Sequence, residues 1–212
     1  MSITRERFDA IRREWGEVGS WAVWADAPPG EGVKARVGDL SMLDPDENPG
    51  LLATVNPDVV MLGINGSGAP TAEPFSSFHD PSPRANHFKL RHAYRGTPFW
   101  GAYLTDTFKG IPSYGARRTF EYLRANPDVV EAQLARLLEE LGTLGSEDPL
   151  LVAFGRDVHR ILQERLGDRF RIARVPHYAH FLSKEEYRAQ ALAGIEECLV
   201  AGSAADAVRS PR

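Results

Sequence analysis

One segment of the chain combines closely spaced glycines with a polar side chain that could act on a ligand. It spans residues 63–68, Gly-Ile-Asn-Gly-Ser-Gly, and directly follows a short apolar run. Glycines give such a turn its conformational freedom, and the Asn65 amide can orient water or a ligand because it offers donors and an acceptor. A plain strand-to-loop turn explains the glycines equally well. Asn65 is therefore the residue that favours a functional role.

The spacing of these glycines argues against two common phosphate-binding loops. The glycines occupy the first, fourth and sixth places, and residues 69–74, Ala-Pro-Thr-Ala-Glu-Pro, are a poor start for a helix. A dinucleotide site needs a helix N-terminus directly behind its glycines, so no nicotinamide or flavin cofactor is expected. The segment also lacks the Lys-Ser/Thr pair of a P-loop. We expect no cofactor.

Composition excludes further classes of site. Cys198 is the single cysteine of the 212 residues, which rules out an intramolecular disulfide and a cysteine-ligated iron–sulfur cluster. The sequence has no HExxH pattern, and we expect no metal. No apolar run approaches the roughly 18 residues of a membrane span, and the N-terminus lacks an apolar signal core. We expect a cytoplasmic protein with no membrane partner.

Strands and helices alternate along the chain. The clearest strand is the continuous apolar run 58–64, bounded by Pro57 and the glycine loop. Shorter apolar or alternating runs predict three further strands, at 102–105, 150–154 and 170–175. Helical spacing predicts helices over 4–17, 115–125, 128–141, 157–166 and 183–200. Ser183-Lys184-Glu185-Glu186 is a capping box at the start of the last helix.

This order of elements predicts a doubly wound, three-layer α/β/α domain. The domain covers residues 1–202, has a four-stranded parallel sheet, and is followed by a disordered tail at 203–212. In such sheets, ligands bind outside the carboxyl ends of the strands. The expected strand ends carry residues 63–68, Asp106, Gly155 and His177. Four separate segments therefore converge on one edge of the sheet.

Taken in order, these segments resemble motifs of the uracil-DNA glycosylase superfamily. Residues 63–65, Gly-Ile-Asn, are similar to the motif that ends the first strand in several of its families. Residues 103–109 resemble its base-recognition stretch, Tyr-x-Thr-Asn-x-x-Lys. Residues 151–156 look like its apolar strand ending in glycine and a basic residue, and residues 175–178 lie where it places a catalytic histidine. The resemblance covers about residues 57–200 and implies a uracil-DNA glycosylase-like fold.

The same resemblance implies a monofunctional DNA-base N-glycosylase that acts in base excision repair. Such an enzyme flips a base out of DNA and cleaves its N-glycosidic bond, so the departing base becomes anionic. His177 would stabilise that base and Asn65 would position the attacking water. Phe78, or else Phe75, would stack on the base, although both could be core residues. The base pocket would be completed by Gly63, Ile64, Gly66, Ser67 and Asp106.

Two positions depart from the family pattern. Asp106 stands where the family usually has Asn, whose amide donates to one uracil edge atom and accepts from its neighbour. An ionised carboxylate only accepts, so a base that offers an amino group is an alternative substrate. Asp106 could equally be a helix N-cap. Tyr178-Ala179 follow His177 where the family commonly has Pro-Ser, and His180 could take the role of His177.

A basic stretch with interleaved aromatic residues, 84–95, could hold a phosphate backbone, although charge runs are often only solvated. The expected phosphate contacts are Arg84, Lys89, Arg91, Lys109, Arg156 and His180. We therefore expect a monomer whose partner is single- or double-stranded DNA. Two rivals stay open. One is a non-catalytic binder of modified bases or single strands; the other is a hydrolase of free nucleosides or nucleotides, which would suit the net charge of −4.

Overall fold

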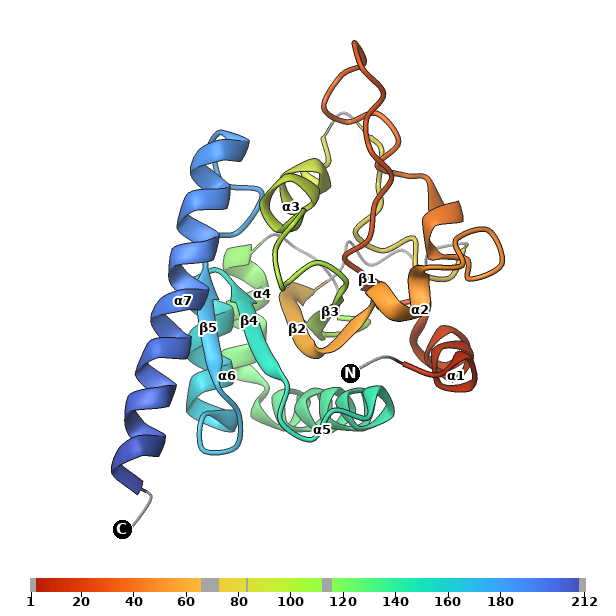
Figure 1. The fold of residues 1–212 in the computed structure, drawn as a ribbon. Coiled ribbons are helices and arrows are strands. Elements are labelled where there is room, and N and C mark those ends of the chain that lie inside the picture. The colour runs from red at the N-terminus through yellow and green to blue at the C-terminus, as the bar shows by residue number, and fades with distance from the viewer. Residues whose placement is uncertain (1–2, 66–72, 83, 112–115, 210–212) are drawn as a thin grey trace.

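The computed structural model describes residues 3–65, 73–82, 84–111 and 116–209, and its centre is a five-stranded sheet (Figure 1). The strand order is β1-β3-β2-β4-β5, with β1 antiparallel to β3 and the other neighbouring strands parallel. The strands are β1 (Ser20–Trp21), β2 (Asn56–Asn65), β3 (Ala102–Phe108), β4 (Leu150–Phe154) and β5 (Ile172–Val175). The four predicted parallel strands are confirmed.

The prediction of only four strands is wrong because β1 was missed. Its two residues, Ser20 and Trp21, pair with Leu104 and Tyr103 at the outer edge of the sheet. Both are buried, so they show no alternation of apolar and polar residues. A two-residue strand is too short to give a periodic signal, and only the tertiary pairing creates it.

Helices cover both faces of the sheet. The helices are α1 (Arg5–Trp15), α2 (Leu51–Thr54), α3 (His87–Tyr94), α4 (Ala116–Ala125), α5 (Pro127–Leu144), α6 (Arg156–Leu166) and α7 (Lys184–Arg209), with a 3-10 turn at Leu40–Leu43. Side chains of β2 alternate between two cores: Val60 and Leu62 pack with α1, α4, α5 and α6, whereas Val59 and Met61 pack with α3 and α7. The arrangement gives the expected helix–sheet–helix layers (Figure 1).

The last helix begins as the sequence predicts and ends later. The Ser183 hydroxyl accepts from the Glu186 N–H at 3.1 Å, and the Glu186 carboxylate accepts from the Ser183 N–H at 2.8 Å. This is the predicted capping box. Helix α7 continues to Arg209, through most of the segment predicted as a disordered tail; residues 210–212 lie outside the described part of the chain. Helix α3 lies inside the basic stretch 84–95, where no helix was predicted.

No helix in the described part of the chain is both long and apolar enough to cross a membrane.

The topology places the candidate residues at one edge. The chain passes from β2 to β3 on one side and then crosses to β4 on the other side, so the strand order reverses at β2. In doubly wound sheets, ligands bind outside the carboxyl ends of the strands at such a reversal. Asn65 ends β2, and Gly155 directly follows β4.

Candidate functional site

Gly63 and Asp106 lie side by side where β2 and β3 approach the carboxyl edge. They are paired in the register of the two parallel strands. A Cβ atom on Gly63 would lie 2.2 Å from Oδ1 of Asp106, well inside contact distance. Any other residue at position 63 would therefore displace the Asp106 carboxyl. The glycine is needed here for close approach.

Asp106 has an unusual protonation equilibrium. Part of the residue stays accessible, but burial of its carboxyl is the largest effect on its pKa and raises it to about 7. Lys109 lowers this pKa and Glu140 raises it. The residue lies within β3, which continues to Phe108, so the alternative role of helix N-cap is wrong.

A buried ionic network lies on the other face of β3. The Glu140 side chain, from α5, is fully buried and accepts hydrogen bonds from the Tyr103 hydroxyl and the Thr105 hydroxyl, each at 2.8 Å. Its second carboxylate oxygen lies 2.5 Å from Nζ of Lys109. The same ammonium donates to the backbone carbonyl of Asp106 at 2.6 Å. The network thus fixes the backbone on which the Asp106 carboxyl stands.

Asn65 ends β2 two residues after Gly63, and therefore lies on the same face of the strand. Its Nδ2 atom is buried, and within the described structure it has no hydrogen-bond partner. A buried amide donor left unpaired costs about 1–3 kcal/mol, which a ligand acceptor would recover. Ile64 faces the opposite core and is partly buried there. The predicted residues Gly66 and Ser67 lie outside the described residues.

His177 follows β5 and is held in one tautomer. The Ala179 N–H donates to Nδ1 of His177 at 3.1 Å. Burial, helped by the charge of His180, lowers the pKa of His177 to about 4. The imidazole is therefore neutral near pH 7 and carries its proton on Nε2, which leaves an N–H free to donate. The Gly155 backbone, with a φ of 96°, passes close to the His177 Cβ.

Tyr178 joins the strand ends into one cluster. Its ring centroid is 4.5 Å from that of His177, stacked, and 5.3 Å from that of Phe154 at a right angle. The Asp106 carboxyl lies near enough to add to the effect of burial in raising the pKa of Tyr178. We call this group the edge cluster; its members are Asp106, Phe78, His87, Phe154, His177 and Tyr178. We assign Asn65 to it from its strand position, two residues beyond Gly63 on the face where Gly63 meets Asp106.

The two candidate stacking residues occupy different cores. Phe78 belongs to the edge cluster, with its ring 6.4 Å from Tyr178, whereas Phe75 packs against Phe8 at 5.4 Å on the opposite side of the sheet. Both rings are buried, and both residues have left-handed backbones, with φ of 67° and 66°. Such conformations cost on the order of 1–3 kcal/mol each and are concentrated at functional sites.

Hydrogen bonds hold this strained segment in place. The Phe75 N–H donates to the Gly16 carbonyl at 2.7 Å, and the Ser20 hydroxyl donates to the Phe75 carbonyl at 2.7 Å. The Trp24 indole N–H donates to the Phe78 carbonyl at 3.3 Å. The fold therefore fixes the position of Phe78 beside Tyr178.

Three of the predicted phosphate contacts are already engaged inside the protein. Lys109 is 4% exposed and pairs with Glu140. The Lys89 ammonium donates to the His180 carbonyl at 2.8 Å. The Arg91 guanidinium donates to the carbonyls of residues 25, 33 and 35. These three cations brace the fold in this arrangement, because their donors point at protein acceptors.

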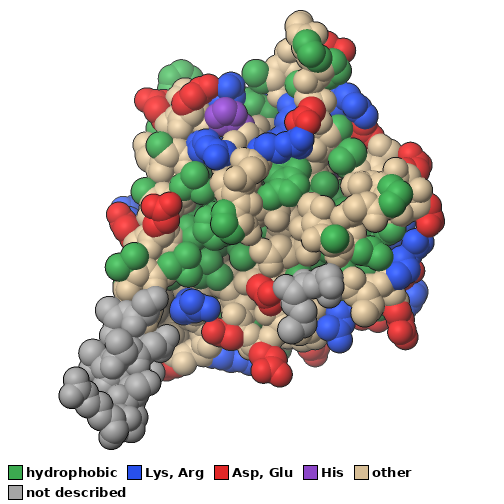
Figure 2. Space-filling view, in the orientation of Figure 1, with side chains coloured by type: hydrophobic (Ala, Val, Ile, Leu, Met, Phe, Trp, Pro, Cys, Tyr) green, Lys and Arg blue, Asp and Glu red, His purple; other side chains and the backbone are tan. Residues whose placement is uncertain are grey.

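The remaining members of that predicted set, Arg84, Arg156 and His180, are exposed. In the space-filling view, basic side chains gather around a histidine near the top of the molecule, over α3 and the first turns of α7 (Figure 2). Acidic side chains lie beside them, so the positive character is local (Figure 2). Within the described residues, no group of three His, Cys, Asp or Glu side chains could hold a metal ion.

The chain matches no family model, no curated protein and no solved structure in the three comparisons with known proteins.

Sequence reasoning missed three residues of interest. Glu140 stands beside Glu139 and looks like half of a solvated pair, yet it lies on the helix stripe of Leu137, Leu141 and Leu144. A carboxylate on such a stripe is a signal for a buried partner. Tyr178 was noted only as a departure from a motif. Phe181 is fully exposed in the loop that follows His177, which the sequence alone does not reveal.

Proposed function

We propose that this protein is a DNA-base N-glycosylase, similar to uracil-DNA glycosylases, that hydrolyses the bond between a flipped base and its sugar. The observation that carries the proposal is the edge cluster. It combines the neutral His177 with a free Nε2–H, the unpaired Asn65 amide and the Asp106 carboxyl. A planar ligand with both oxygen and nitrogen at its edge suits these groups and the surrounding rings.

The proposed reaction needs no group beyond the chain and water. The water oxygen forms a bond to C1′ of the sugar as the bond from C1′ to the base nitrogen breaks, and the electron pair leaves with the base. Asn65 holds the water through its amide. His177 donates its Nε2–H to the base oxygen on which negative charge develops, an effect typically worth about 10²–10³ in rate for one donor. The proton lost by water finally resides on the departing base.

The raised pKa of Asp106, about 7, changes the expectation for base recognition. An ionised carboxylate offers only acceptors, but a protonated carboxyl offers one donor and one acceptor. This is the pattern of the asparagine amide that the family usually has at this place. Near neutral pH a substantial fraction of the protein carries that protonated form, so uracil is compatible with the proposed pocket.

The loop that bears His177 also suits contact with DNA. Phe181 is fully exposed four residues after His177. Apolar side chains of this kind enter base steps and unstack them, which is the step that flipping requires. The exposed residues Arg84, Arg156 and His180 remain as candidate phosphate contacts. In this proposal Phe181 opens the stack while the edge cluster receives the base.

The proposal is tested on oligonucleotides that carry uracil, hypoxanthine, xanthine or only normal bases, in single- and double-stranded form. Alkaline cleavage reports abasic sites. We expect cleavage of at least one modified substrate, and at least a hundredfold loss of rate in Asn65→Ala and His177→Ala. His92→Ala serves as the matched control, because His92 lies on α3 and belongs neither to the edge cluster nor to the candidate phosphate contacts.

Three other outcomes would contradict the glycosylase proposal or favour one of its two alternatives. If no substrate is cleaved and the variants bind as the wild type does, the glycosylase proposal fails for these bases. Tight binding of a modified base without turnover would favour the non-catalytic binder. Turnover of free nucleosides that does not weaken with salt would favour the nucleoside hydrolase, because DNA binding falls steeply with salt.

A further inference from the structure

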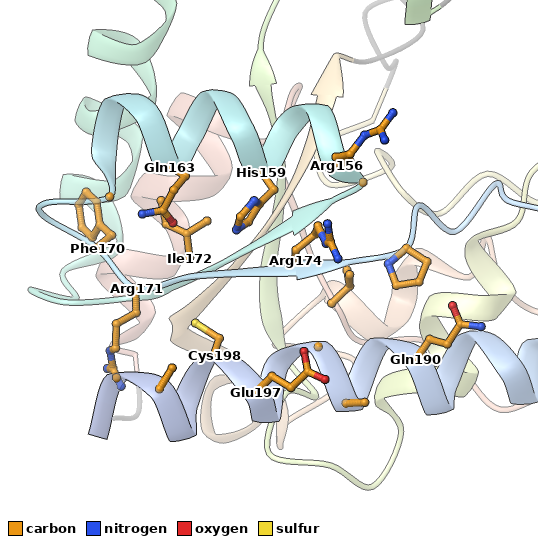
Figure 3. Close-up of a pocket in the computed structure, with 18 of the residues that line it drawn as sticks. Arg156, His159, Gln163, Phe170, Arg171, Ile172, Arg174, Gln190, Glu197 and Cys198 are labelled. Carbon is orange, nitrogen blue, oxygen red and sulfur yellow. The ribbon is translucent and has the colours of Figure 1, made fainter. Parts of the chain in front are cut away.

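A hollow lies between α6 and α7, near the end of β5 that leads to His177. Its volume is about 850 Å³, within the range of small-molecule and cofactor sites. Side chains of α6 and α7 face one another across β5, with Arg174 near the middle and Arg171 toward one end (Figure 3). We call it the lateral groove.

The lateral groove is continuous with the proposed site. Gly155, Pro176 and His180 line one end of it, and these residues flank His177 in space or in sequence. From there the groove follows β5 as far as Arg171 and Gly202. A strand that leaves the His177 end of the edge cluster in this direction would therefore meet the groove.

Its charge favours an anionic occupant. Its lining holds three arginines against a single carboxylate, that of Glu197. Arg156 and Arg174 are exposed and form no ion pair within the described part of the chain, whereas Arg171 lies 3.4 Å from Asp148. Unpaired arginines that line a concave surface attract phosphates, which they bind through a planar fork of donors.

The lateral groove does not suit a peptide strand added to the sheet. His159 and Cys198 both lie close to the backbone of Ile172 on the outer strand. A Cβ atom on Gly194 would lie 2.3 Å from the Arg174 carbonyl oxygen, so α7 presses directly on the strand. Strand addition needs a free backbone edge, and these contacts occupy the edge of β5.

The lining also favours a sugar–phosphate backbone over stacked bases. Apart from its two histidines, Phe170 is the one aromatic residue among those that line the lateral groove, and it is buried. Single-stranded sites that read bases use exposed aromatic platforms. Contact with phosphates by arginine, and with sugars by Gln163 and Gln190, needs no such platform.

We propose that the lateral groove holds the phosphodiester backbone of the nucleic acid strand as it leaves the edge cluster on one side. This inference rests on the proposed function for the position of the base, but not on the excision reaction. It makes Arg174 a determinant of affinity for a strand, and it gives that affinity a direction, because the groove leaves the site on one side only.

The test measures fluorescence anisotropy of single-stranded oligonucleotides with uracil near one end. The strand is extended from about 6 to about 16 nucleotides on either the 5′ or the 3′ side. We expect one direction of extension to raise the affinity about tenfold, and Arg174→Gln to remove most of that gain. For each lost phosphate contact, the slope of log K against log salt should fall by about 0.7.

Two further variants make the test specific. Arg160→Gln removes the same charge from α6 at a position that does not line the groove, and should keep the gain. Ala201→Glu adds a carboxylate to the groove lining at an exposed position, and should abolish the gain. Equal gains in wild type, Arg174→Gln and Ala201→Glu would overturn the inference even if uracil is excised.

The remaining outcomes separate the two proposals. If no base is excised but the Arg174-dependent gain persists, the groove inference stands and the glycosylase proposal falls. If a mononucleotide or inorganic phosphate saturates the groove with the same dependence on Arg174 and strand length has no effect, the groove is a small-anion pocket and the inference is overturned.

Discussion

The polar groups on the two faces of β3 differ in whether they have hydrogen-bond or ion-pair partners inside the protein. On the α5 face, Tyr103 and Thr105 donate to Glu140, whose other carboxylate oxygen pairs with Lys109. On the other face, the Asn65 amide nitrogen, from the adjacent strand β2, has no partner in the described structure, and Asp106 has a strongly raised pKa. The carboxylate on the first face is held by internal contacts, whereas the Asn65 amide on the second has none among the described residues.

We propose that this difference separates a structural face from a functional one. Buried polar groups are almost always paired inside a protein, so an unpaired group beside a perturbed carboxyl marks a place where a ligand supplies the contact. The strained backbone of Phe78 lies on the same side. The paired network can therefore be expected to control stability, and the unpaired side to control activity.

The largest effect should come from breaking the paired side. Glu140→Ala leaves the buried Lys109 ammonium without its carboxylate and removes the acceptor of Tyr103 and Thr105. Removal of one partner of a buried ion pair costs about 3–5 kcal/mol. Thermal and urea unfolding measure the loss. Glu139→Ala, an exposed neighbour on the same helix, should change stability little; equal losses in both variants would contradict the assigned role of Glu140.

A substitution on the unpaired side should change activity and leave stability almost unchanged. Asn65→Ala removes a buried donor that has no protein partner, so the free energy of unfolding should stay the same or rise slightly. The rate of base excision should nevertheless fall about a hundredfold or more. Unfolding curves and alkaline-cleavage rates on the same preparations give the comparison. A loss of stability as large as that of Glu140→Ala would mean that Asn65 is structural.

A third substitution, at Gly63 on β2, tests the role of Asp106 on the neighbouring strand β3. Gly63→Ala places a Cβ where Oδ1 of Asp106 now lies, so the carboxyl must move. We expect about a tenfold loss of excision rate and an altered preference among modified bases, because the proposed base-reading group, Asp106, is displaced. Gly32→Ala is the matched control, since nothing lies within 4 Å of its added Cβ. Unchanged preference in Gly63→Ala would remove Asp106 from base recognition.

The parallel strands and their common edge could be predicted because they depend on local patterns. The apolar run before Gly63 and the run ending at Phe154 each specify a buried strand, and alternation with helices specifies parallel pairing. The capping box at Ser183 specified the start of α7. The convergence of the strand ends follows from this topology alone.

Contacts between distant segments could not be predicted. The pairing of Lys109 with Glu140 depends on how α5 crosses β3, so Lys109 looked like a surface cation. The strand at Ser20 exists only because β3 offers it an edge. The raised pKa of Asp106 is caused mainly by burial, and burial is a property of the folded chain. Sequence therefore located the candidate residues but not their charge states.

The pH dependence of stability is the most direct test of the protonation state of Asp106. Its carboxyl ionises near pH 3.8 in the unfolded chain and at about 7 in the folded protein, so the folded state binds more protons between these values. Stability from this group is therefore lost as pH rises from about 4 to about 7. The histidines with lowered pKa, among them His87 and His177, act in the opposite sense over part of that range.

The comparison of wild type with Asp106→Asn isolates the carboxyl, because the histidines are common to both proteins. The amide cannot ionise, so the melting temperature of the variant should exceed that of the wild type at pH 8, and the gap should close toward pH 4. Each kcal/mol corresponds to about 2–4 °C for a chain of this size. Lys109 and Glu140, whose charges act on the Asp106 carboxyl from the other face of β3, are likewise common to both proteins. A gap that is independent of pH would mean that Asp106 is ionised throughout and reads the base only as an acceptor.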